Sequence, residues 1–131
     1  MWVKNIAINH CRLLESITLE LSPRANIFIG PNASGKTSLL ESLNILSKGR
    51  SFRTSHINDV ISYNNDSILV TANIIDDTDN VSHIGINKTK NKTKIRINKK
   101  DIYSQSELSF LFTFNCYTPK FCWINYRFSF N

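Results

Sequence analysis

The sequence predicts a mixed α/β fold of the α+β kind, with short strands around one glycine-bounded loop and one helix. Three observations predict it. Apolar and polar residues alternate in short runs before residue 30 and after residue 67, glycines bound an eight-residue loop at 30–37, and leucines recur at helical spacing directly after that loop. With 131 residues, of which 41% are hydrophobic, the chain is at most one small globular domain.

Strands are expected ahead of the loop. Residues 3–9 alternate loosely, and residues 17–21 alternate cleanly between apolar and polar side chains, which is typical of a strand with one buried face. Residues 22–24, Ser-Pro-Arg, have turn chemistry. Residues 26–29 are nearly all apolar and predict a third strand that is covered on both faces.

The loop carries the clearest chemical signal. Its residues fit the phosphate-binding pattern G-x-x-x-x-G-K-[ST]: Gly30-Pro31-Asn32-Ala33-Ser34-Gly35-Lys36-Thr37. Backbone N–H groups at a helix entrance converge on one spot, where the helix dipole adds positive charge, so a triphosphate suits that spot best. Gly30 and Gly35 are expected to adopt conformations closed to other residues. We expect Lys36 to bind the β- and γ-phosphates and Thr37 to ligate Mg²⁺; the alternative is a chance strand–turn–helix.

The leucine spacing predicts a helix over residues 35–47 that stops at Gly49. The segment that follows, residues 49–55, is polar and basic with one aromatic residue. Arg50 and Arg53 within it either contact the phosphates of a nucleotide or nucleic acid, or lie in a solvated loop.

A further strand is expected from residue 68 to the paired acids Asp76 and Asp77. An apolar run closed by two acids resembles a Walker B motif, which holds Mg²⁺ and polarises water. Thr71 and Asn73 interrupt the run, so we interpret residues 76–80 as a hairpin turn, with a returning strand after it.

Positive charge is concentrated in one segment. Residues 88–100 hold seven cations and no acid, whereas the whole chain has a net charge of +6. From residue 88 to residue 96 every second residue is a cation: Lys88, Lys90, Lys92, Lys94 and Arg96. In an extended strand they would share one face, and a turn near Asn91 would make the segment the end of a hairpin. Such a ribbon predicts either a contact with a nucleic-acid backbone or a charged edge that blocks sheet aggregation.

Residues 103–130 differ in composition, since they hold ten of the fourteen aromatic residues. Phe110, Phe112 and Phe114 have a period of two, which predicts one more buried strand before Pro119. We divide the chain into an incomplete nucleotide-binding lobe, residues 1–119, and an aromatic tail, residues 120–131. The composition of the tail fits either a truncated or frame-shifted product or the terminus of a fragment.

Cysteine usage and hydropathy indicate the compartment. The chain has an odd number of cysteines, and their spacing is not that of a metal site: Cys11, Cys116 and Cys122. We interpret them as buried or free thiols in a reducing cytoplasm. No run of eighteen apolar residues exists, and the N-terminus lacks the apolar segment of a signal peptide. A cytoplasmic protein without membrane contact is expected.

Several stretches together resemble the N-terminal part of RecF, a family of bacterial recombination-repair ATPases of the ABC/SMC-like class. They are Asn-His-Cys-Arg at 9–12, Leu-Ser-Pro at 21–23 and residues 27–61, of which Ser-Lys-Gly-Arg-Ser-Phe-Arg at 47–53 is the most family-specific. The resemblance implies the first lobe of a P-loop ABC-type ATPase with an antiparallel β subdomain. It also implies that residues 30–37 bind ATP and that Arg12 lies near the nucleotide. Family members usually have glycine where this chain has Ala33, which is tolerable if the backbone angle of Ala33 stays on the allowed side.

The resemblance implies partners as well. RecF-like proteins bind ATP and DNA, dimerise on ATP, and act with RecO and RecR to help load RecA at single-stranded gaps and junctions. The family is much longer, and its signature motif and true Walker B acids have no counterpart here. We therefore expect an N-terminal fragment that does not hydrolyse ATP appreciably by itself. Two alternatives stay open: a small stand-alone nucleotide-dependent enzyme such as a kinase, and a truncated remnant without function.

Overall fold

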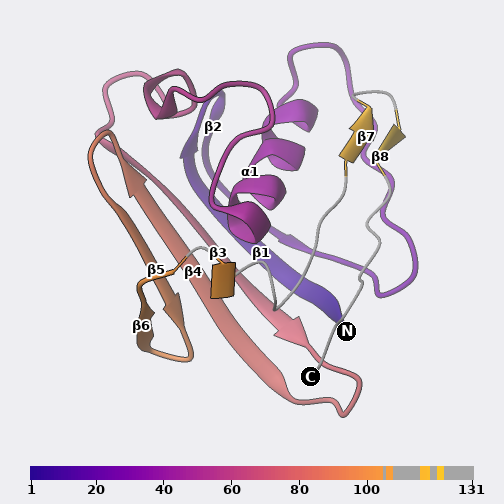
Figure 1. Cartoon of the computed structure of the whole chain (residues 1–131). Helices are drawn as coiled ribbons and strands as arrows, with labels where there is room; N and C mark the ends of the chain where they lie inside the picture. The colour runs from indigo at the N-terminus through magenta and orange to yellow at the C-terminus, as the bar shows by residue number, and fades with distance from the viewer. Residues whose placement is uncertain (105, 108–115, 119–120, 123–131) are drawn as a thin grey trace.

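The computed structural model describes residues 1–104, 106–107, 116–118 and 121–122. Within them, six strands form one antiparallel sheet in the order β2-β1-β3-β4-β5-β6, and helix α1 lies across one face of that sheet (Figure 1). The elements are β1 (Trp2–Cys11), β2 (Leu14–Glu20), α1 (Lys36–Lys48), the 3-10 helix η1 (Ile57–Asp59), β3 (Ser67–Ile75), β4 (Val81–Thr89), β5 (Thr93–Ile97) and β6 (Lys100–Ile102). A separate antiparallel pair is made by β7 (Cys116–Thr118) and β8 (Phe121–Cys122). The mixed α+β class predicted from the sequence is confirmed.

The strands predicted at 3–9, 17–21 and from residue 68 onward are present as β1, β2 and β3. β1 lies between β2 and β3, and it pairs antiparallel with both. The turn predicted after residue 75 is also present, since β3 and β4 pair along their whole length with Ile75 opposite Val81.

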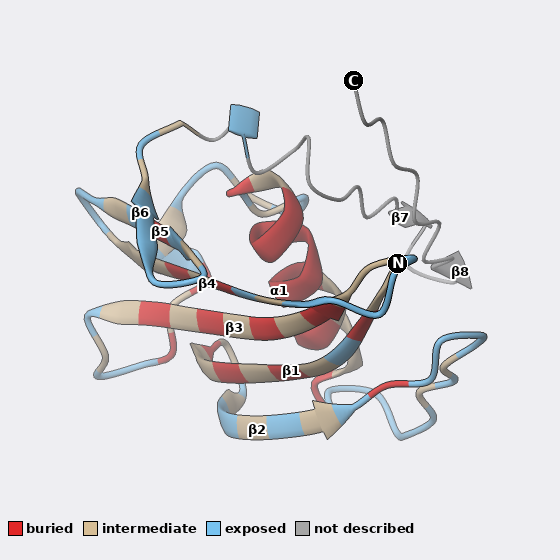
Figure 2. Ribbon diagram, turned by 90° about the horizontal axis from the view of Figure 1, so that it is seen from below, coloured by how far each residue is buried: buried red, intermediate tan, exposed pale blue. Residues whose placement is uncertain are grey.

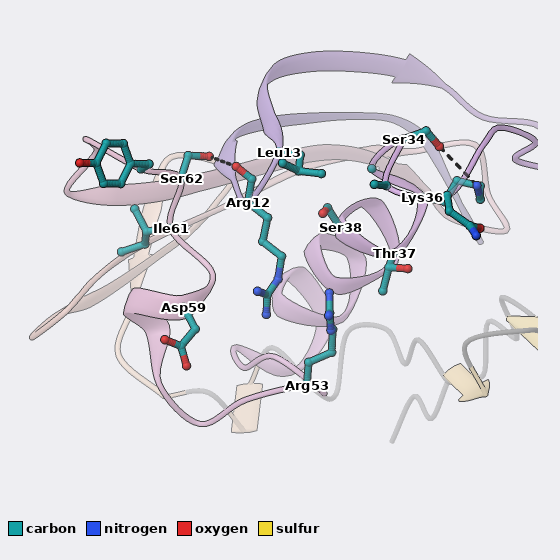
Figure 3. A pocket seen from close by; sticks show the side chains of 14 residues that line it. Arg12, Leu13, Ser34, Lys36, Thr37, Ser38, Arg53, Asp59, Ile61 and Ser62 are labelled. Carbon is teal, nitrogen blue, oxygen red and sulfur yellow. Dashed lines mark hydrogen bonds between the residues drawn. The ribbon is translucent and has the colours of Figure 1, made fainter.

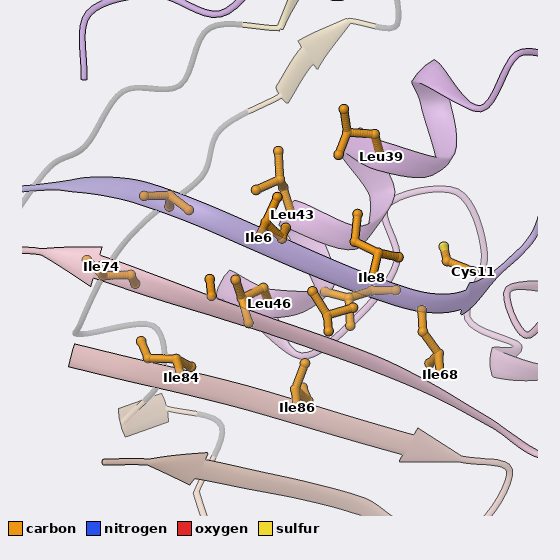
Figure 4. Close-up of a cluster of buried hydrophobic side chains, with 14 of the residues drawn as sticks. Ile6, Ile8, Cys11, Leu39, Leu43, Leu46, Ile68, Ile74, Ile84 and Ile86 are labelled. Atoms are coloured by element: carbon orange, nitrogen blue, oxygen red, sulfur yellow. The ribbon is translucent and has the colours of Figure 1, made fainter. Parts of the chain in front are cut away.

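The core lies between the sheet and the helix. Along β3 every second residue is buried, as expected for a strand with one covered face, and β1 and β4 show related patterns (Figure 2). Ile6 and Ile8 of β1 meet Leu43 and Leu46 of α1, and each of these side chains is at most 1% exposed (Figure 4). Burying one such side chain contributes about 1.5–3 kcal/mol, so this face fixes α1, and the loop before it, relative to the sheet.

Helix α1 has the predicted extent and the predicted stop. Gly49 follows its last residue with a φ of 70°, and the Gly49 N–H donates to the Ile45 carbonyl over 2.8 Å. A left-handed glycine in this position is a common helix terminator, because glycine alone adopts it without a side-chain penalty.

The strand predicted at residues 26–29 is wrong. The structure has no strand there, and the side chains of Ile27 and Ile29 are 83% and 91% exposed, while Phe28 packs against the core. A strand needs a neighbour that accepts and donates its backbone hydrogen bonds, and no described strand pairs with this segment. The segment thus has the apolar composition of a strand that is buried on both faces, but no described strand lies beside it.

Cys11, at the end of β1, is the buried thiol that the sequence predicts. Its Sγ lies 3.6 Å from the Ser38 carbonyl oxygen, and burial raises the pKa of Cys11 to about 11, so the thiol stays protonated at neutral pH. The side chains of Cys116 and Cys122, the predicted strand at Phe110, Phe112 and Phe114, and most of the tail 120–131 lie outside the described residues.

Candidate nucleotide-binding site

The predicted phosphate-binding octet forms an exposed loop that leads into α1. Gly35 occupies the N-cap position of α1 with a φ of 94°, no side chain caps this end, and the first turn contains no acidic residue. The first N–H groups of a helix have no partner within the helix, so an uncapped start offers donors and the positive end of the dipole to an anion.

The two glycines of the loop are needed for different reasons. A Cβ on Gly35 would lie 2.7 Å from Leu14 Cδ2, in addition to the strain of its positive φ. Gly30 has no positive φ, so the expectation of a special backbone conformation is wrong for it. Its Cβ would instead lie 2.8 Å from the Ser34 Oγ, so the Ser34 side chain would have to move to make room for a side chain at residue 30.

Ala33 has a φ of 62° and lies in the left-handed region. The condition under which an alanine would be tolerable here, a backbone angle on the allowed side, is therefore not met. A non-glycine residue in this region loses about 1–2 kcal/mol through contact between its Cβ and the following carbonyl oxygen.

Replacing Ala33 with glycine is expected to stabilise the protein by about 0.5 kcal/mol, because the relief of strain exceeds the added chain entropy of the unfolded state. The matched control is Ala7→Gly in the middle of β1, where the backbone is ordinary. That control is expected to lose about 0.5–1 kcal/mol. Thermal unfolding of both variants measures the difference, and equal losses would contradict the strain at Ala33.

The side chain of Lys36 lies over the loop. Its ammonium donates to the carbonyl oxygens of Gly30 and Pro31, the latter over 2.6 Å, and to the Ser34 hydroxyl over 3.3 Å. These contacts hold the positive charge at the entrance of α1, as the motif predicts.

A cavity of about 510 Å³ adjoins the loop. It is lined by the loop and first turn of α1 (residues 32–38), by the turn after β1 (Arg12, Leu13), by Arg53 and by residues of the 59–63 segment. The side chains of Arg12 and Arg53 point toward one another across it (Figure 3). Its volume is in the range of small-molecule sites. The structure thus brings Arg12 and Arg53 to the phosphate-binding loop.

Arg12 is fixed from two sides. Its backbone N–H donates to the Val60 carbonyl over 2.7 Å, and the Ser62 hydroxyl donates to the Arg12 carbonyl over 2.6 Å. Its Nε donates to Glu41 Oε2 over 2.5 Å and its Nη2 donates to Oε1 over 3.0 Å. This hydrogen bond to Glu41 raises the pKa of Arg12.

Sequence reasoning missed Glu41. The residue is fully buried on α1, four positions before the equally buried Ile45. The signal available in the sequence was a single carboxylate on the apolar face of a predicted helix, which calls for a cationic partner elsewhere in the chain.

Thr37 is the predicted ligand of Mg²⁺, and its half-buried side chain lines the cavity at the start of α1. A hydroxyl oxygen beside a phosphate site fits this cation, which prefers oxygen donors and keeps several waters. In the part of the chain that the structure describes, no three His, Cys, Asp or Glu side chains gather into a metal site.

A second cavity, of about 630 Å³, lies at the other end of α1. Four of its lining residues are cations: Lys48, Arg50, Arg53 and Lys88. None of its lining residues is acidic, and no described carboxylate forms an ion pair with these four cations. Lys88 is half-buried, donates to the Gly49 carbonyl over 2.5 Å, and has its pKa lowered by desolvation. Phe52 adds an aromatic side chain that is 40% exposed.

The basic hairpin is present, but its cations do not share one face. The turn that includes Asn91 changes the alternation, so Lys88 lies opposite Thr93, whereas Lys94 lies opposite Asn87. Opposite residues of an antiparallel pair share a face, so Lys88 lies on the face of Ile86 and Ile95, the helix-covered face. Lys94 and Arg96 lie on the other face, where both form ion pairs with Asp101.

The paired acids after β3 form a hairpin turn, as predicted, and not a Walker B site. The Asp76 carboxylate accepts hydrogen bonds from the backbone N–H groups of Thr78 and Asn80 and from both side chains. These hydrogen bonds lower the pKa of Asp76 to about 2, and the bond from the Thr78 hydroxyl has the largest effect. Asp77 pairs with the amino group of Met1. The turn lies beyond the Trp2 end of β1, whereas the nucleotide cavity lies beyond the Cys11 end.

The fold and the loop define the class of protein: a P-loop nucleotide-binding lobe in which an antiparallel sheet packs on the phosphate-loop helix. The family model described as the RecF/RecN/SMC N terminal domain matches residues 2–117. The chain therefore belongs to the RecF/RecN/SMC family, and the resemblance to the N-terminal region of RecF is confirmed. No helix in the described residues is long and apolar enough to cross a membrane.

Similar proteins agree. The DNA replication and repair protein RecF of Actinobacillus pleuropneumoniae serotype 5b is 37% identical over 121 residues, which cover 92% of this chain and 33% of that protein. The RecF of Thermoanaerobacter sp. strain X514 is 39% identical over 109 residues. A solved structure described as the recombination mediator protein RecF-ATP in the RecFOR pathway superimposes with a TM-score of 0.83 at 27% identity, over 91% of this chain and 33% of that one. The chain spans about a third of the length of these relatives.

Proposed function

We propose that the chain is the ATP-binding lobe of a RecF-type DNA replication and repair protein. The observation that supports this most strongly is the convergence, on one cavity, of the uncapped start of α1 with Lys36, Arg12 and Arg53. A polyanion the size of a triphosphate is the ligand that neutralises these groups. RecF is described as an ATP complex in the similar solved structure.

Each part of the site has a role in this proposal. The N–H groups of residues 32–37 bind the phosphate oxygens, and Lys36 exchanges its contacts with the loop carbonyls for the β- and γ-phosphates. Thr37 holds Mg²⁺ together with the phosphates. Arg12 and Arg53, which also line the cavity, supply further positive charge. A magnesium ion held there would supply positive charge that offsets the negative charge of the phosphates.

Replacing Lys36 with alanine is expected to weaken ATP binding by at least about tenfold, because a charge-assisted contact to phosphate contributes about 1.5–3 kcal/mol. Titration calorimetry with Mg²⁺ and ATP measures the affinity. Lys48→Ala is the matched control, since Lys48 ends the same helix but lines only the second cavity. Equal ATP affinity of the wild type and Lys36→Ala would remove the proposal.

The second cavity is where we propose that DNA is contacted, through Arg50, Arg53 and Lys88. Four cations around one acid-free cavity give a concentrated positive potential, and Phe52 beside them provides a surface for base stacking. By contrast, the positive charges of Lys94 and Arg96 are partly neutralised by Asp101, and Lys90 and Lys92 lie exposed in the turn. The same chemistry would suit single-stranded and gapped DNA.

Replacing Arg50 or Lys88 with glutamine is expected to weaken binding of a gapped duplex. Each substitution should also reduce the slope of log affinity against log salt concentration by about one, because one phosphate contact disappears. Fluorescence anisotropy over a salt series measures both quantities. Lys92→Gln is the control, with an equal change in net charge on the exposed turn. Equal effects of all three substitutions would show a diffuse charge effect and contradict a site at this cavity.

We propose that the family's wider assembly applies to the protein of which this lobe is a part: an ATP-dependent dimer that acts with RecO and RecR. The exposed Ile27 and Ile29 support the need for a further protein surface over the strand-like segment before the loop. Hydrolysis would then need groups from such a surface, and the isolated chain would bind ATP without appreciable turnover. A stand-alone kinase is less well supported, because the acids at 76–77 lie at the far end of β1.

A further inference from the structure

Glu41 is the only charged side chain among the buried residues of the described chain, and its exposure is 0%. Taking a carboxylate out of water costs several kcal/mol unless charged and hydrogen-bonding partners replace the water. Glu41 has three such partner atoms: Nε and Nη2 of Arg12 and the hydroxyl of Ser51. These partners come from two different segments, and both line cavities beside α1.

The contact with Arg12 has a definite geometry. Glu41 engages the guanidinium through Nε and Nη2, so the Nη1 edge is not used by the carboxylate. Arg12 lines the nucleotide cavity, and its backbone is fixed by Val60 and Ser62. A guanidinium held along one edge keeps its other N–H groups pre-organised for a phosphate, since its planar fork does not need to be ordered on binding.

The contact with Ser51 fixes a turn. The Ser51 Oγ donates to Glu41 and accepts the backbone N–H groups of Arg53, over 2.9 Å, and Thr54, over 3.3 Å. Arg53 is the basic residue that lines both cavities. The position of Arg53 therefore depends on a chain of hydrogen bonds that begins at Glu41.

We propose that Glu41 is a positioning residue, which presents Arg12 directly, and Arg53 through Ser51, to the phosphates in the nucleotide cavity. This inference rests on the proposed function, in which that cavity binds ATP. Glu41 itself touches no ligand. It acts by fixing the two arginines, so its loss should lower ATP affinity through them.

The test compares ATP affinities, measured with Mg²⁺ by calorimetry, for wild type, Glu41→Gln, Arg12→Lys and the double variant. Glutamine keeps the volume but cannot engage both nitrogens of Arg12 as a carboxylate does. Glu41→Gln is expected to lose about tenfold in affinity, the effect of one charged hydrogen bond. The double variant should lose little more than the larger single loss, because both changes remove the same interaction. If the affinity loss of the double variant equals the product of the two single losses, the inference is overturned.

Two further variants distinguish a positioning role of Glu41 from a purely structural one. Ile45→Val shortens a core side chain on the same helix that lines neither cavity, so it should lower the melting temperature without changing ATP affinity. Ser51→Ala leaves the Arg12 pair intact and is expected to lose about two- to fivefold in ATP affinity through Arg53. If Glu41→Gln does not fold, Ser51→Ala alone decides, and wild-type affinity in it would overturn the inference.

The outcomes for the two proposals are distinct. ATP binding by the wild type that is lost in Lys36→Ala supports the proposed function. In that case, unchanged affinity of Glu41→Gln would overturn the positioning role alone. Absence of ATP binding by the wild type would remove the proposed function and this inference together.

Discussion

Replacing Gly35 with alanine is expected to disrupt the phosphate-binding loop and to reduce ATP affinity by at least tenfold. The new Cβ would lie 2.7 Å from Leu14 Cδ2, and the alanine would have to adopt a φ of 94°. A backbone in this region costs about 1–3 kcal/mol for a residue with a side chain, and the Leu14 side chain would also have to move. The loop can relieve the backbone strain by rotating the peptide groups that start α1, which would change the direction of their N–H groups.

The control for this prediction is Gly85→Ala in β4, where a Cβ would meet Thr71 Cγ2 at 3.3 Å and the φ is not positive. Thermal unfolding and ATP titration are measured for both variants. Gly35→Ala should lose both stability and affinity, and Gly85→Ala should keep the ATP affinity of the wild type. Similar ATP affinities for the two variants would show that the conformation of Gly35 is not required for binding.

Local signals in the sequence predicted most of the site. The loop, the helix and the Gly49 stop depend on residues within a few positions of one another, and all three are present. The turn at Asp76 was also predictable, because its hydrogen bonds join residues two and four positions apart. The assignment of Arg12 to the site came from family resemblance, since no local pattern marks it.

The features that the sequence did not predict have a different cause. They depend on residues far apart in the chain or on the exact length of a turn. The run at 26–29 has strand composition, but a strand exists only beside a partner. The face of Lys94 depends on how many residues the turn after β4 contains, and a change of one moves every later side chain to the other face. The pairing of Arg12 with Glu41 joins residues 29 positions apart, which no periodicity reveals.

Replacing Arg12 with alanine is expected to be the most destabilising single change at the site. It leaves Glu41, which is 0% exposed, without its cation, and removing one partner of a buried pair costs about 3–5 kcal/mol. A small domain has a total stability of about 5–15 kcal/mol, so a large part of it would be lost. Urea unfolding at neutral pH measures the change. Arg24→Ala, at an exposed position outside any described ion pair, is the control and should stay within about 0.5 kcal/mol of the wild type.

Two further measurements decide whether the unpaired charge is the cause. Replacing both partners, as Arg12→Met with Glu41→Leu, removes the buried charge and should recover most of the stability, because apolar residues of similar volume often match or exceed a buried pair. ATP affinity should stay low in this double variant, since Arg12 no longer faces the phosphates. If the double variant stays as unstable as Arg12→Ala, the loss would instead be assigned to the missing packing of the Arg12 side chain.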